Sequence, residues 1–222
     1  MFLDTHGVAP GEVFQDVLWH RLCDCDVLIM LDTHSYFESR WTAAEFGRAL
    51  AKGICVLRVG WPGVSASARA KTATNIELEQ ADFDDTDLLV QEAITRLANQ
   101  LERARSLGHA VRSVNMYSKI ENSTKQIGGT VSSAGLGNSV EIALPGGSEL
   151  LLVPAIGVPS AGTLQSAEAL GDGTSVAVVY DQVGLLPTWQ THLEWLGTRI
   201  QTVKWIKASE IAWQLANWEE TK

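Results

Sequence analysis

The fold class is most evident between Cys25 and Gly60, where the sequence is CDVLIMLDTHSYFESRWTAAEFGRALAKGICVLRVG. This stretch holds two short apolar runs, at 26–31 and 54–59, with a polar loop and a segment of helical character at about 40–52 between them. Short apolar runs bounded by polar residues are typical of strands that are buried on both faces of a sheet. The stretch therefore predicts a strand, a helix and a second strand, which is the building unit of a parallel sheet.

The same alternation continues on both sides of this stretch. The spacing of apolar residues predicts a helix at 12–23, and a loop at 60–75 precedes a long helix at about 85–107 that we expect to end near Gly108. Residues 109–135 are polar and contain glycines. Beyond them, strands are expected at 140–144, 150–153, 176–180 and 200–206, and helices at 161–170, 187–197 and 209–218.

These patterns predict an α/β protein in two parts. Residues 1–118 form the first expected domain, which has a mostly parallel sheet. Residues 119–222 form a second, smaller α/β domain, and the boundary is placed near 118–128. The sequence of the second part matches no pattern that assigns it a role.

Composition and charge narrow the classes of partner. The chain has 222 residues and a formal net charge of -9, from 17 Lys and Arg against 26 Asp and Glu. Such a chain lacks the positive field that nucleic-acid binding needs, so we expect no nucleic-acid partner. No run approaches the roughly 20 apolar residues that span a bilayer, and the first residues do not resemble a signal peptide, so we expect no membrane partner. Three cysteines, an odd number, suit a reducing compartment, and we expect a cytoplasmic location.

The loop between the first apolar run and its helix is the candidate site. Ligands of parallel α/β sheets bind outside the carboxyl ends of the strands, and residues 32–40 lie there. His34, Ser35 and Tyr36 are therefore candidates for contact with a substrate. A phosphate cradle at 157–162 and a ligand contact by Asp181 are weaker candidates. Cysteine and histidine spacings match no metal site, so none is predicted.

The helix that follows this loop has two different faces. Ser39 is its expected N-cap. The residues expected to face the sheet are Ala43, Phe46, Gly47 and Leu50. Trp41, Glu45 and Arg48 fall on the opposite side, where Glu45 either pairs with Arg48 on a solvated surface or joins Trp41 in a ligand site. The Trp-x-x-x-Glu spacing alone is too common to decide between these interpretations.

Several segments taken in order resemble a bacterial Toll/interleukin-1 receptor (TIR) domain. They are CDVLIML at 25–31, YFESRW at 36–41, EFGRAL at 45–50 and ICVL at 54–57. Upstream, FLDT at 2–5 resembles the second strand of that family, and VAPG at 8–11 resembles its BB loop, which ends in Pro-Gly. The resemblance covers about residues 1–107.

The resemblance implies a flavodoxin-like domain and, as in many bacterial members, cleavage of NAD+ between nicotinamide and ribose. By this resemblance, Glu45 stands at the position of the family's catalytic glutamate. The substrate-binding positions that the resemblance implies are Trp41, Ser35, Tyr36, His34 and Pro10. NAD+ is then a substrate, and no cofactor is required. The resemblance also implies a homo-oligomer through TIR–TIR contacts and a role in bacterial defence signalling. The alternatives are a non-enzymatic TIR scaffold and a nucleotide-binding sensor whose site lies in the second part.

The chain departs from the family pattern in two places. His6 and Gly7 stand near the point where the family often has Arg-Asp. The chain also begins at the family's second strand, and the first strand, which is central in the family's sheet, is not represented. Three explanations stay open: the given chain begins late, another subunit donates the strand, or residues 150–153 fill the gap.

Overall fold

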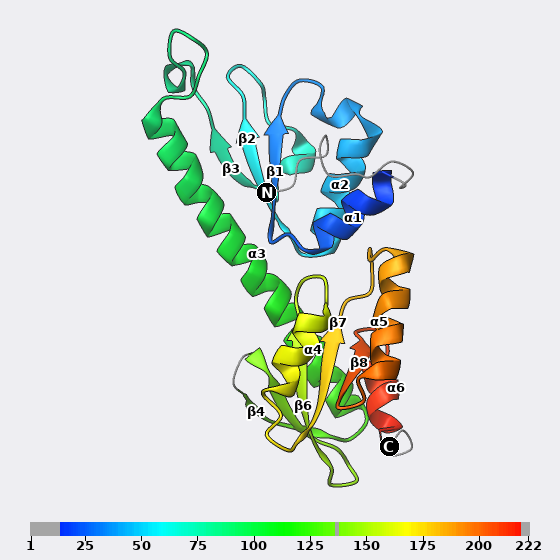
Figure 1. Cartoon of the computed structure of the whole chain (residues 1–222). Helices are drawn as coiled ribbons and strands as arrows, with labels where there is room; N and C mark the ends of the chain where they lie inside the picture. Colours follow the sequence, from blue (N-terminus) through cyan, green and yellow to red (C-terminus); the bar gives the residue numbers. More distant parts are fainter. Residues whose placement is uncertain (1–13, 136–137, 219–222) are drawn as a thin grey trace. The chain divides into compact units, whose positions relative to one another are not determined.

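The computed structural model describes residues 14–135 and 138–218, and Figure 1 shows the course of the chain. Its contacts divide it into two compact units. One comprises Cys25–Arg112, and the other joins the described residues up to Asp24 to those from Ser113 onward. Each unit has its own sheet and helices, so we name them the three-stranded unit and the five-stranded unit. The prediction of an α/β protein with two α/β parts is confirmed.

The three-stranded unit contains a parallel sheet in the order β1-β2-β3. Its elements include β1 (Val27–Asp32), α2 (Arg40–Ala51), β2 (Cys55–Gly60) and β3 (Thr74–Glu77). The register places Asp32 beside Gly60 and Gly60 beside Glu77, so the three strands end level at one edge. The expected strand, helix and strand from 26 to 59 are confirmed, whereas β3 is a strand that the sequence patterns did not predict.

The two faces of this sheet are covered by different helices. On one face, Leu57, Val59 and Ile76 pack with residues of α3 (Gln91–Gln126). The alternate residues of the strands, among them Met30 and Val56, are also buried and lie on the opposite face, where α2 packs. Both faces of the central strand β2 are therefore covered, as its apolar sequence requires.

Helix α2 turns a different face inward from the one expected. Its buried residues are Phe46 and Ala49, whereas Gly47 and Leu50 are exposed. The aromatic ring of Phe46 packs edge-on against that of Phe37, with 5.4 Å between centroids, which fixes the rotation of the helix. The predicted inward stripe was therefore wrong at Gly47 and Leu50. The N-cap prediction is confirmed, because the Ser39 side chain accepts a hydrogen bond from the Trp41 N–H.

Helix α3 does not end near Gly108 but continues to Gln126, a length of 36 residues. Gly108 lies where the helix meets the start of β1, and a Cβ there would lie less than 3.0 Å from the backbone oxygen of Asp26. Glycine serves here for close approach between helix and strand, not for termination. The expected domain boundary near residue 118 thus falls inside a continuous helix, which is shared by both units.

The five-stranded unit has a mixed sheet in the order β4-β5-β6-β7-β8. An antiparallel meander of β4 (Thr130–Ala134), β5 (Val140–Ala143) and β6 (Glu149–Ala155) leads into parallel β7 (Ser175–Tyr180) and β8 (Val203–Lys207). The helices are α1 (Phe14–Cys23), α4 (Ala161–Glu168), α5 (Pro187–Arg199) and α6 (Ile211–Ala216). All of these except β4 were expected from the sequence. Strand β4 was missed because its five residues are polar or exposed.

Strand β1 stands at one edge of its sheet. Within residues 14–135 and 138–218, no strand pairs with its outer edge. Strand β6, which contains residues 150–153, pairs with β5 and β7 in the other sheet. Residues 150–153 therefore do not complete the three-stranded sheet, and that explanation of the missing strand is wrong.

None of the helices in the described part of the chain is both long enough and apolar enough to cross a membrane. Helix α3 has the length, but charged and polar residues occupy most of its surface.

Candidate functional site

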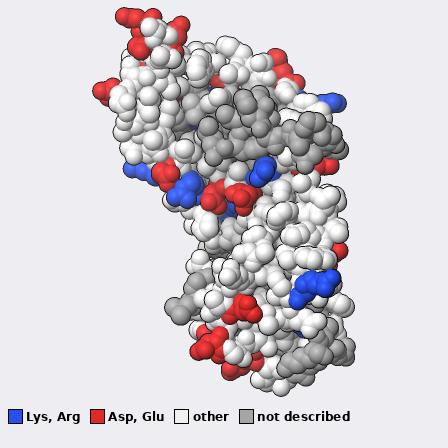
Figure 2. Space-filling model, in the orientation of Figure 1, with Lys and Arg blue, Asp and Glu red and all other residues white. Residues whose placement is uncertain are grey.

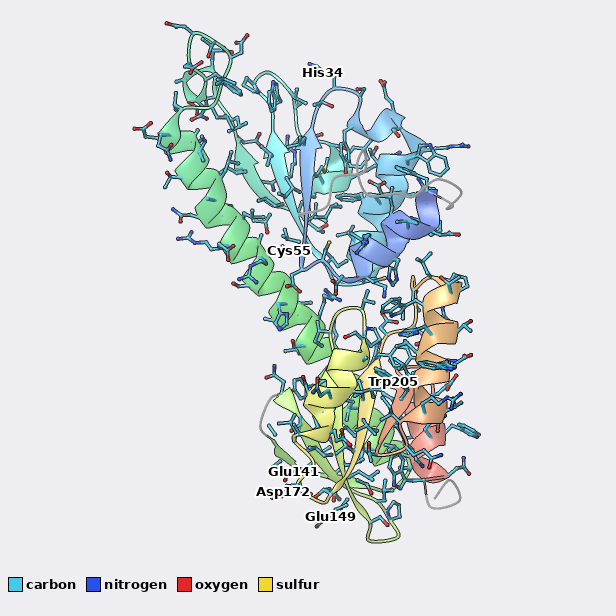
Figure 3. All side chains as sticks on the ribbon, viewed as in Figure 1. His34, Cys55, Glu141, Glu149, Asp172 and Trp205 are labelled. Atoms are coloured by element: carbon cyan, nitrogen blue, oxygen red, sulfur yellow. The ribbon has the colours of Figure 1, made fainter. Side chains whose placement is uncertain are left out.

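An open hollow lies where β1 and β2 end. Its volume is about 450 Å³, and two loops supply its lining, one after each strand. The lining residues are Asp32, Thr33, His34, Phe37, Glu38, Gly63, Val64, Ser65, Ser67 and Arg69. Figure 3 shows His34 on the loop just beyond the end of β1. The loop after the first strand therefore borders a hollow at the carboxyl edge of the sheet, and that it binds a ligand there stays a prediction.

A buried ion-pair group lies at the same edge of the sheet. The Arg58 side chain on central β2 is fully buried, and its Nε donates a hydrogen bond of 2.5 Å to Oδ2 of Asp32 on β1. Its Nη1 donates to Oε1 of Glu77 on β3. Gly60 lies between these carboxylates, and a Cβ there would be 2.9 Å from Arg58 Nη1. The arginine therefore ties the ends of all three strands together, and glycine leaves room for it.

Arg58 is charged in this setting. Burial alone would lower the pKa of its guanidinium, but the hydrogen bonds to Asp32 and Glu77 outweigh burial and raise the pKa above its ordinary value. Its third nitrogen, Nη2, is buried and has no hydrogen-bond partner among the described residues. One arginine thus balances two carboxylates, of which Asp32 is buried and Glu77 is largely exposed.

The loop after β1 is held by aromatic packing and a threonine. The short helix η2 (Tyr36–Glu38) carries Phe37, whose ring lies edge-on to those of Tyr36 and Phe46. The Thr42 hydroxyl donates to the backbone oxygen of Tyr36. Burial, together with the negative charges of Glu45 and Asp32, raises the pKa of Tyr36 to about 12. Tyr36 therefore lies within electrostatic reach of both carboxylates.

The predicted catalytic residue, Glu45, is half-buried on α2, one turn after Trp41. Trp41 is 44% exposed, and the Arg40 guanidinium stacks on its ring at 4.3 Å from the centroid. Neither Glu45 nor Trp41 lines the hollow. The helix that carries both residues nevertheless packs on the loop that borders the hollow, because Phe46 of α2 contacts Phe37, which lines the hollow.

The other expected contacts have different positions. His34 is exposed and lines the hollow, whereas Ser35 is exposed and does not. Pro10 lies outside the described residues. In the five-stranded unit, Asp181 accepts a hydrogen bond from the Val183 N–H, as a turn residue does.

In the loop at 157–162, which was a weaker candidate for phosphate binding, a backbone N–H is hydrogen-bonded to a carboxylate of the chain itself. Oδ1 of Asp24, just after α1, accepts a hydrogen bond of 3.0 Å from the N–H of Val158. The loop then leads into α4, whose N-cap Ser160 accepts a hydrogen bond from the N–H of Thr163. This loop fixes the end of α1 within its own unit.

Sequence reasoning missed Asp32, Arg58 and Arg69. A charged residue inside the apolar run CVLRVG was a usable signal, because a buried arginine needs carboxylate partners. Arg69 and the serines beside it gave no such signal. They lie about thirty residues after the loop with which they share the hollow.

No group of three or more His, Cys, Asp or Glu residues in the described ranges could hold a metal ion. The side chain of Cys23 is buried, and those of Cys25 and Cys55 are partly buried. The chain matches no protein-family model, no curated protein and no solved structure. The case for a function therefore rests on its own residues and on their resemblance to the TIR pattern.

Proposed function

We propose that the three-stranded unit cleaves the nicotinamide–ribose bond of NAD+, with Glu45 as the catalytic carboxylate. The observation that carries the proposal is the packing of α2 on the loop after β1. Thr42 and Phe46 of α2 contact that loop at Tyr36 and Phe37, and Phe37 lines the hollow, so the helix that carries Glu45 packs against a wall of the hollow. The TIR-like residue order from 25 to 57 supports the same assignment.

The chemistry suits a single carboxylate. The bond between C1′ of the ribose and the nicotinamide nitrogen breaks, and its electron pair goes to that nitrogen, so neutral nicotinamide leaves without a general acid. The ribose then carries oxocarbenium character, which a nearby carboxylate stabilises. Water adds to C1′ and loses a proton, which gives ADP-ribose. Attack by an adenine nitrogen instead gives a cyclic product.

The half-buried setting of Glu45 suits this role. A carboxylate near the positive ribose acts more strongly where water is partly excluded than on an open surface. Trp41, one turn earlier, offers a large exposed aromatic surface beside it, on which a planar ring can stack.

One observation favours a scaffold function as the alternative. Ile29 and Leu31 on edge strand β1 are 41% and 53% exposed. Apolar side chains on a strand edge with which no described strand pairs are a surface on which a second copy can pair. In this alternative the chain signals by self-association and leaves NAD+ intact. Self-association and catalysis are also compatible, since the resemblance implies an oligomer.

Product analysis tests the proposal. Purified protein at high concentration is incubated with NAD+, and nicotinamide, ADP-ribose and cyclic products are separated by chromatography. We expect release by the wild type and at least a roughly 100-fold slower release by Glu45→Gln. Glu102→Gln is the matched control, because Glu102 is an exposed carboxylate of the same unit whose partner is Arg105. It should retain the wild-type rate.

Equal rates for the wild type and Glu45→Gln would contradict the assignment of Glu45. Absence of release from wild type, combined with self-association in sedimentation, would favour the scaffold function.

A further inference from the structure

We propose that the hollow at the ends of β1 and β2 binds the sugar-phosphate part of a nucleotide, with Arg69 taking the phosphate and Asp32 the ribose hydroxyls. This inference rests on the proposed function, because it names where that substrate is held. It does not follow from the TIR-like motif, since Arg69 lies in none of the segments that carry the resemblance.

Arg69 is the cation of the hollow. It lies in η3 (Ala68–Ala70), and its guanidinium stacks over the Phe37 ring at 5.5 Å from the centroid. No carboxylate among the described residues lies within ion-pair distance of it, although Asp32 and Glu38 line the same hollow. Stacking holds the flat group in place and leaves its N–H donors available, which suits two-point binding of a phosphate.

Hydroxyl groups surround this arginine. Ser65, Ser67 and Thr33 line the hollow and can donate to phosphate oxygens. The chain carries a net charge of -9, and a group of acidic residues lies on the loop before α3, at Asp84, Asp85 and Asp87 (Figure 2). The general field therefore repels anions, and a phosphate can be held only by local groups such as Arg69.

Asp32 is suited to the ribose. Its Oδ2 is held by Arg58, and no described residue donates a hydrogen bond to its Oδ1. A carboxylate at the carboxyl end of a strand can accept hydrogen bonds from the vicinal hydroxyls of a ribose. Arg58 is then a positioning residue, because its hydrogen bond fixes the orientation of Asp32 and Arg58 does not line the hollow itself.

The volume of the hollow suits one part of a dinucleotide rather than the whole molecule. About 450 Å³ lies within the range of small-ligand sites and holds a sugar phosphate. Glu45 lies outside the hollow, so the scissile end of a dinucleotide would extend past Phe37 toward α2, which packs on that ring. A long substrate such as NAD+ fits this division between an anchoring part and a reacting part.

Calorimetric titration with ADP-ribose, AMP and adenosine tests the inference. We expect Arg69→Ala to weaken binding of ADP-ribose and AMP about ten-fold or more, and to leave adenosine binding unchanged. Arg103→Ala, which removes an exposed arginine of α3 in the same unit, is the matched control and should bind like the wild type.

The ribose contact is tested on the wild type alone, because a change at Asp32 could disturb the buried pair. AMP should bind about ten-fold tighter than its 2′,3′-dideoxy analogue. Equal affinity of the two would overturn the role of Asp32, and an unchanged affinity of Arg69→Ala for ADP-ribose would overturn that of Arg69.

The two proposals fail in different ways. Binding of ADP-ribose that depends on Arg69, without cleavage of NAD+, would support the hollow and refute the catalytic function. Cleavage that depends on Glu45, with a KM for NAD+ unaffected by Arg69→Ala, would support the catalytic function and refute the role of the hollow.

Discussion

The close approach of α3 to β1 predicts opposite effects of the same substitution at two glycines of one unit. Alanine stabilises a helix interior by about 1 kcal/mol relative to glycine. At exposed Gly47 on α2, a Cβ would meet nothing within 4 Å, so Gly47→Ala should gain up to that amount. At Gly108, the new Cβ would lie less than 3.0 Å from the Asp26 oxygen and 3.2 Å from the Cys55 Cβ.

A side chain at residue 108 can be accommodated only if α3 moves away from β1 by about an ångström. The Arg112 guanidinium donates a hydrogen bond of 2.7 Å to the Cys25 oxygen, and movement of the helix would weaken it. Overpacking of this kind costs about 1–3 kcal/mol, which exceeds the gain in helix propensity. We therefore expect Gly108→Ala to lower the free energy of unfolding by up to about 2 kcal/mol.

Thermal unfolding followed by circular dichroism measures both variants. For a unit of this size, 1 kcal/mol corresponds to a shift in Tm of about 4–8 °C. Gly47→Ala should unfold at a higher temperature than the wild type, and Gly108→Ala at a lower one. A Gly108→Ala variant as stable as Gly47→Ala would refute the close helix–strand packing.

Two further predictions concern the buried groups near the hollow. Arg58→Met should lower the free energy of unfolding by about 3–5 kcal/mol in urea, because it leaves Asp32 buried without its partner; a loss below about 1 kcal/mol would show that the pair is not buried. The pKa of Tyr36 is raised to about 12 from an ordinary value of 10.0, so its neutral form favours the folded state below pH 10 and that contribution is lost as pH rises toward 12. Tyr36→Phe should therefore show a shallower fall in Tm between pH 10 and 12, and phenolate absorbance from Tyr36 already at pH 10 in the folded protein would contradict this.

Sequence patterns predicted the elements that are buried, because burial restricts their residues to apolar types. The apolar runs of β1 and β2 need cover on both faces, and their length admits a strand but hardly a helix. The short strands β3 and β4 lie at sheet edges, where polar residues are tolerated, so periodicity gave no signal. Gly108 was interpreted as a helix end because sequence alone does not distinguish a cap from a close approach.

The candidate site was predictable only in part. The loop with His34 follows a strand, and parallel sheets place such loops at the ligand-binding edge. Its partner loop, with Ser65 and Arg69, is brought to the same edge by pairing of β2 beside β1, which composition does not reveal. The orientation of Glu45 depends on the rotation of α2, which is fixed by packing of Phe46 on Phe37.

The most direct test of the account is the rate at which nicotinamide is released from NAD+ by the wild type and by Glu45→Gln, each first shown to bind ADP-ribose. Binding of ADP-ribose confirms that the variant is folded, because Glu45 does not line the hollow. The account predicts equal binding by both proteins and at least a roughly 100-fold slower release by Glu45→Gln than by the wild type. Equal binding with equal release, or no release by either protein, would contradict it.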